Sequence, residues 1–158
     1  MSNKENKKTP YSEVFELFLG LISDPDLALL TEGMLDEQML TYLNLSIVKF
    51  TYPKVNIRDK NDDEMQFNVE LSIDEKAILA NLMVIEWVKT QIHNIDLMEN
   101  PMTVSDFTSP NQGSMLRAIN VAKDNAAKEA KQMIMAYERM SNTDFRESRF
   151  REIGGGKF

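Results

Sequence analysis

Apolar residues recur at helical spacing along four stretches of the chain, and this pattern predicts four α-helices. The first stretch covers residues 10–22 and the second about 35–50. The third covers 72–97 and the fourth about 110–140. In the first, second and fourth stretches the apolar residues fall on one helix face: Tyr11, Val14, Phe15, Phe18, Leu21 and Ile22; Leu35, Met39, Leu40, Leu43, Ile47 and Phe50; Met115, Leu116, Ile119, Ala122, Ala126, Ala130, Met133, Ile134 and Tyr137.

Residues 72–97 differ from the other stretches because their apolar positions do not form a single stripe. Between Ala77 and Val88 only Asn81 and Glu86 interrupt the apolar run. A helix that is apolar on most of its faces has to be surrounded by other elements. We therefore predict a mainly α fold, a small bundle of about four helices around a buried central helix.

Short capping patterns mark the expected helix starts. Ser72 and Glu75 form a capping box, in which each side chain bonds the backbone N–H of the other residue. Thr9–Pro10 is typical of an N-cap followed by proline at the first helical position, and Ser109–Pro110 repeats the pattern before the fourth helix.

Residues 51–71 break the helical pattern and predict a short β-hairpin over 54–70. Val55–Ile57 and Phe67–Val69 alternate apolar and polar residues, as strands do. A lone hairpin is marginally stable in water, so we expect it to lean on the helices or on a neighbouring subunit. The connection between the strands carries four acidic residues: Asp59, Asp62, Asp63 and Glu64.

Residues 141–158 have no helical stripe and end in three glycines, which predicts an extended C-terminal arm. Arginine and aromatic residues are enriched at the centres of protein interfaces, so the arm favours contact with a partner protein. Arginine and phenylalanine can also hold phosphate and stack on bases, which leaves a nucleic-acid contact as the alternative. The residues concerned are Phe145, Arg146, Arg149, Phe150, Arg151 and Phe158.

The chain therefore divides into a disordered N-terminus (1–8), a helical domain (9–140) and the arm (141–158). Residues 9–138 contain 21 Asp/Glu and 10 Lys/Arg, whereas the two ends each carry a small positive balance within a total of −7. The negative net charge of residues 9–138 repels the phosphates of DNA. The basic ends could dock on acidic neighbours, including copies of the same body.

Residue types exclude several kinds of chemistry. The chain has no cysteine and one histidine, which excludes disulfides, thiolate chemistry and multi-histidine zinc sites. No apolar run reaches the roughly 20 residues that a membrane span needs. The N-terminus has no apolar region typical of a secretory signal. We expect a soluble protein without contact to membranes.

Two groups of residues resemble sites with chemical function, a calcium loop and a general base. Four residues match ligand positions of an EF-hand calcium loop: Asp59, Asn61, Asp63 and Glu70. Glu64 stands where that loop requires glycine, so a chance acidic loop is favoured. His93 lies near Asp96 and Glu99 and could be oriented as a general base, but no nucleophile stands at a telling spacing. We therefore predict no metal, no cofactor and no enzymatic activity.

Four segments of the chain stand in a distinctive order and spacing: PYSEVFELFLGLISDPDL (10–27), LTYLNLSIVKF (40–50), ELSIDEKAILANLMVIEWVKTQIHNI (70–95) and DFTSPNQGSMLRAI (106–119). In this pattern the chain resembles the head-to-tail connectors of tailed bacteriophages, the adaptor or head-completion proteins found in phages of Gram-positive hosts. The resemblance covers about residues 10–138 and includes no catalytic signature.

The resemblance implies a virion structural protein that is assembled in the host cytoplasm. Copies of the chain would form a ring, twelve-fold in such connectors, beneath the portal protein. The ring would extend the channel for passing double-stranded DNA and would present a platform for the next neck or tail protein. The acidic loop around Asp59–Glu64 is then a candidate channel or inter-subunit loop, and the arm a candidate docking segment. The alternative is a nucleic-acid-binding or regulatory helical protein that uses the arm.

Overall fold

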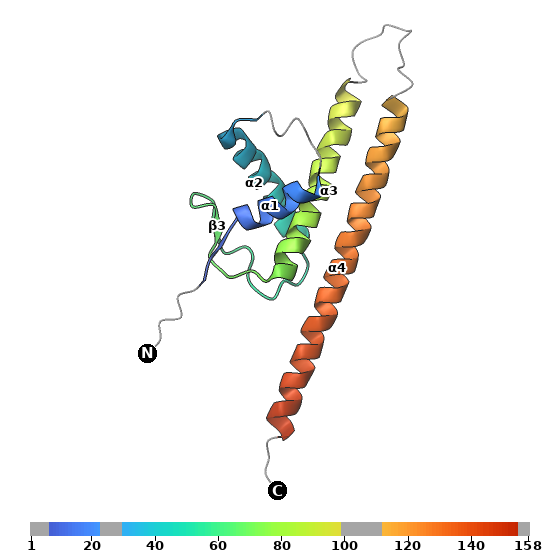
Figure 1. Ribbon diagram of the computed structural model, residues 1–158. Coiled ribbons are helices and arrows are strands. Elements are labelled where there is room, and N and C mark those ends of the chain that lie inside the picture. The colour runs from blue at the N-terminus through green and yellow to red at the C-terminus, as the bar shows by residue number, and fades with distance from the viewer. Residues whose placement is uncertain (1–6, 23–29, 99–111, 155–158) are drawn as a thin grey trace.

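The computed structural model describes residues 7–22, 30–98 and 112–154; the side chains of 95–98, 112–113, 115–116 and 142–154 lie outside this description. The elements in chain order are β1 (Thr9–Pro10), α1 (Ser12–Leu21), α2 (Glu32–Lys49), β2 (Lys60–Asn61), β3 (Gln66–Phe67), α3 (Ile73–Met98) and α4 (Gln112–Gly154). The described part of the chain is therefore mainly helical, with four helices and a small antiparallel sheet (Figure 1). This confirms the predicted fold class.

Helix α3 is the centre of the bundle, as its apolar pattern predicted. It packs against α1, α2 and α4 (Figure 1). The polar interruptions of its apolar run both have partners: Asn81 donates to the carbonyl of Ala77 at 2.9 Å, and the buried Glu86 carboxylate accepts from Lys49 and Lys89. Because a buried polar group without a partner is costly, these bonds allow both residues to lie in a central helix. The buried apolar side chains of α3 are Ile78, Leu79, Ala80, Leu82, Met83 and Val88.

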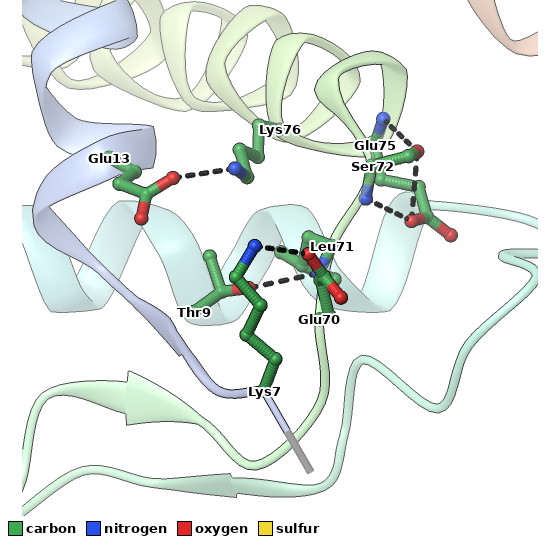
Figure 2. Close-up of polar contacts among 8 residues, drawn as sticks. All are labelled: Lys7, Thr9, Glu13, Glu70, Leu71, Ser72, Glu75 and Lys76. Atoms are coloured by element: carbon green, nitrogen blue, oxygen red, sulfur yellow. Dashed lines mark hydrogen bonds and ion pairs between the residues drawn. The ribbon is translucent and has the colours of Figure 1, made fainter. Parts of the chain in front are cut away.

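The capping box at the start of α3 forms as predicted and continues into other parts of the chain. The Ser72 N–H donates to Glu75 Oε2 at 2.8 Å, and the Glu75 N–H donates to Ser72 Oγ at 3.2 Å (Figure 2). From α4, the Tyr137 hydroxyl donates to Glu75 Oε1 at 2.6 Å and accepts the Lys54 N–H at 2.8 Å. Burial and then the Glu75 carboxylate raise the pKa of Tyr137 well above its usual range. One carboxylate thus joins α3, α4 and the segment after α2.

The predicted hairpin is present, but its strands are shorter and the first lies later in the chain. β2 and β3 pair antiparallel, with Lys60 opposite Phe67 and Asn61 opposite Gln66. The expected strand at Val55–Ile57 is wrong, because the Ile57 N–H instead bonds the Val55 carbonyl in a tight turn at 2.9 Å.

The predicted N-cap at Thr9 is also wrong, because the residues around it belong to the sheet. Thr9 and Pro10 form β1, which pairs with β3 and makes β3 the central strand. The Thr9 hydroxyl accepts the N–H of Leu71 at 2.9 Å (Figure 2), and the Tyr11 N–H donates to the Met65 carbonyl at 2.8 Å. Because the Thr9 hydroxyl and the Tyr11 N–H both bond distant residues, neither caps a helix at residue 9, and α1 begins only at Ser12.

Helix α4 is longer than its apolar stripe predicted. Its 43 residues span about 65 Å, against about 39 Å for the 26 residues of α3. Residues 141–154 continue the helix, so the expected arm projects past the start of α3 with helical backbone up to Gly154 (Figure 1). Within the stripe, Ala126, Ala130 and Tyr137 are buried, but Ala122 is exposed. The capping pattern expected at residues 109–110 lies outside the described residues.

Replacing Tyr137 with phenylalanine tests the network around Glu75. The change removes one partner from a buried carboxylate and one from the Lys54 N–H, while the ring and its packing stay. A buried group left without its bond costs about 1–3 kcal/mol. We expect the free energy of unfolding, measured by urea denaturation, to fall by about that amount.

Tyr42→Phe is the matched control, because Tyr42 is also buried but its hydroxyl bonds no described residue. Its stability should stay within about 0.5 kcal/mol of the wild-type protein. Equal losses for the two variants would contradict a specific role for the Tyr137 hydroxyl.

Candidate interaction surfaces

The loop between β2 and β3 contains Asp62, one of the four acidic residues that the sequence singled out. Asp62 Oδ1 accepts from the Tyr11 hydroxyl at 2.7 Å, and Lys60 Nζ lies 2.5 Å from both Asp62 carboxylate oxygens. Lys60 and then Tyr11 lower the pKa of Asp62. Burial, followed by the bond to Asp62, raises the pKa of Tyr11. Asp62 therefore ties the hairpin to the residue that precedes α1.

Two of the other three acidic residues that the sequence singled out bond within the chain, and the third is exposed. Asp59 Oδ1 accepts from the Asn68 side chain at 2.8 Å, and Glu64 pairs with Lys8 at 3.4 Å. The Asp63 carboxylate is exposed and bonds no described residue. Asp62, Asp63 and Glu64 thus lie between β2 and β3, and Asp59 lies directly before β2. Three of the four carboxylates bond other residues of the chain. Their role as a channel or inter-subunit loop stays a prediction.

The basic N-terminus pairs with acidic groups of its own chain. Lys7 lies 2.8 Å from Glu70, and the Glu70 carboxylate raises the pKa of Lys7, chiefly through this hydrogen bond. Nearby, Lys76 at the start of α3 pairs with Glu13 of α1 at 2.5 Å (Figure 2). Exposed pairs of this kind contribute little singly, but together they hold β1 against the start of α3.

Neither the candidate calcium loop nor the candidate general base at His93 forms a site among the described residues. Asn61 Oδ1 accepts the backbone N–H groups of Asp63 and Glu64, which makes it a turn residue, and Glu70 is paired with Lys7. Across the described residues, no three His, Asp or Glu side chains gather closely enough to hold a metal ion. His93 is exposed on α3, and the carboxylates expected beside it lie outside the described side chains.

The residues of the arm lie on the helical end of α4. Positions 145, 146, 149, 150 and 151 fall within α4, and Phe158 lies outside the described residues. Residues three and four apart on a helix share a side, so the helical backbone brings positions 146, 149 and 150 onto one side. The arm thus stays a candidate docking segment, now with a helical rather than an irregular backbone.

A surface that the sequence reasoning missed lies where α2 ends. The Val48 and Tyr52 side chains are 71% and 81% exposed. Tyr52 also has a left-handed backbone, with φ of 55°. In the sequence, a proline at position 53 indicates only that a helix ends before it, and no local pattern marks Tyr52 as part of a surface site. The two exposed residues border a pocket of about 290 Å³, lined by Ile47, Val48, Phe50, Thr51, Tyr52, Pro53, Asn56, Ile57 and Arg58.

Asp62→Asn removes a carboxylate whose pKa the fold lowers. Such a group stabilises the protein above the usual aspartate pKa of about 4, and this contribution is lost as the pH falls through the lowered folded value. We expect the variant to melt at a lower temperature than the wild-type protein at neutral pH. The gap should narrow below about pH 4 in melting curves followed by circular dichroism.

Asp63→Asn is the control one residue away, since its carboxylate bonds no described residue. Its melting temperature should follow the wild-type protein at every pH. A gap for Asp62→Asn that does not change with pH would overturn the ionic explanation.

Comparison of the chain with family models, with curated proteins and with solved structures found no match. Among the described helices, none is both long enough and apolar enough to cross a membrane. Proposals on function therefore rest on the resemblance of the sequence and on the surfaces of this chain.

Proposed function

We propose that the chain is a structural subunit of a phage neck, a head-to-tail connector that forms a ring beneath the portal protein. The order and spacing of the four resembling segments carry this proposal. Three of them fall on α1, on α2 and on the start and length of α3, and the last leads into α4. The resemblance therefore follows the helices that build the core.

The surface of the body supports a protein built for contacts. Exposed large apolar side chains occur on all four helices and just after α2, where they give no stability to the isolated chain. The exposed apolar residues are Leu17, Leu19, Leu21, Met34, Leu45, Val48, Tyr52, Ile73, Val121, Met135 and Met140.

Charge supports a conduit more than a DNA-binding site. Residues 9–138 have a balance of −11 from 21 Asp/Glu and 10 Lys/Arg. Attractive contacts with phosphate would hold a passing duplex, whereas a negative wall lets it slide. We propose the loop around Asp63 as the part of the ring that faces the channel or the next subunit. The partners are then copies of the chain, the portal protein and the next neck or tail protein.

The projecting end of α4 is proposed as the segment that docks on the portal or on an adjacent subunit. Deleting residues 141–158 should leave a folded body, because Ala126, Ala130 and Tyr137 of α4, which pack in the body, all precede the deletion. We expect the truncated chain to keep its cooperative thermal transition but to lose binding to the portal protein of the same virus. Co-purification and electron microscopy of the mixture measure this, and ring formation on the portal by the truncated chain would overturn the arm's role.

The second candidate function is nucleic-acid binding through the arginines of the arm. A filter-binding assay with double-stranded DNA at several salt concentrations separates a connector from a nucleic-acid-binding protein. For a connector we expect weak binding that is unchanged when Arg146, Arg149 and Arg151 become alanine. Tight binding with a steep salt slope that these substitutions abolish would favour the nucleic-acid reading instead.

A further inference from the structure

Charge is separated along α2 and its flanks. Residues 9–48 contain seven Asp/Glu and no Lys or Arg, whereas 49–60 contain four Lys/Arg and one Asp. A single acidic residue in the first turn and a lysine in the last would satisfy the helix dipole. The separation here reaches well beyond those turns, so the dipole alone does not account for it.

The basic end of α2 offers a pocket with both apolar and polar lining residues. The pocket of about 290 Å³ has Val48 and Tyr52 at its rim, exposed to 71% and 81%. Arg58 also lines the pocket, and its guanidinium bonds no described residue. Tyrosine and arginine beside a pocket are the residue types that dominate binding energy at interfaces.

The acidic end of α2 has matching features. Met34 is 56% exposed, and its flexible side chain suits the filling of an irregular pocket. Glu32, Asp36 and Glu37 surround it in the first turns of the helix, are exposed, and have carboxylates that bond no described residue. This end thus combines an apolar side chain with charge opposite to that of Arg58, which lines the pocket.

The two ends cannot meet within one chain. Helix α2 has 18 residues and is about 27 Å long, and a rigid helix holds its ends apart by that distance. Two complementary patches on opposite sides of one body make a head-to-tail contact, which closes into a ring when the rotation between subunits allows.

We propose that the pocket after α2 binds the first turns of α2 of a second copy, with Met34 entering beside Tyr52 and the carboxylates facing Arg58. This inference rests on the proposed ring and names its contact between subunits. The positive C-terminal arm is disfavoured as the occupant, because its arginines would face Arg58. Contact of either patch with the same patch of a second copy is disfavoured too, because it would place like charges together.

Cross-linking between copies tests the contact directly, since the chain has no cysteine of its own. Met34→Cys and Tyr52→Cys are made in separate full-length chains, and circular dichroism checks that both fold. With a short bismaleimide, a mixture of the two should give a covalent dimer, whereas each alone should give none. One chain that carries both cysteines should give a ladder of oligomers.

Ile73→Cys is the matched control, because Ile73 is 80% exposed at the start of α3, outside both patches. Mixed with Tyr52→Cys, it should give only background cross-linking. The contact is overturned if Met34→Cys and Tyr52→Cys do not exceed this background at high protein concentration. It is also overturned if each variant cross-links to itself, or if Phe150→Cys in the arm captures Tyr52→Cys instead.

Charge exchange provides a second test that needs no cross-linker. Arg58→Glu should weaken self-association in sedimentation experiments by at least about tenfold, and adding Asp36→Lys to the same chain should restore it. Glu16→Lys, at an exposed carboxylate on α1, is the control and should not restore it. Rescue by Glu16→Lys, or no rescue by Asp36→Lys, would overturn the proposed pairing.

The outcomes separate this contact from the proposed function. Cross-linking without any binding to a portal would leave the contact standing and overturn the connector. Binding to a portal without a cross-link between positions 34 and 52 would leave the connector function standing and overturn the proposed contact.

Discussion

The Glu75 carboxylate is the interaction on which the arrangement of this chain depends. It is 2% exposed, and it accepts bonds from the Ser72 backbone and from the Tyr137 hydroxyl. A carboxylate in such a place is tolerated only when its oxygens are bonded. Through Tyr137 the network also holds the Lys54 N–H, so the start of α3, the middle of α4 and the segment after α2 must come together.

The buried core around α3 forms within one chain. Its apolar faces are covered by α1, α2 and α4, so burial of the central helix does not require an oligomer. In the proposed ring, contacts between copies would use side chains that the core leaves exposed. Tyr52 and Met34 are two of these, and they lie at opposite ends of α2 among charges of opposite sign.

Local patterns predicted local structure well. The central helix was expected over 72–97 and is Ile73–Met98, and its capping box has the bonds that the residues implied. Of the predicted acidic loop, Asp62, Asp63 and Glu64 lie between two strands, whereas Asp59 precedes the first of them. The features that sequence reasoning missed, β1 and the pocket at Tyr52, depend on segments that meet only after folding.

The sequence by itself determined the helices and the capping box, because helical spacing and caps involve residues at most four or five positions apart. Only the tertiary structure decided what Thr9, Tyr11 and Tyr137 bond. Their partners are 62, 51 and 62 positions away in the chain. A hydroxyl does not reveal from its neighbours in sequence which distant group it will meet. The partner is set by how the helices pack, since every buried polar group must find a bond in the assembled core.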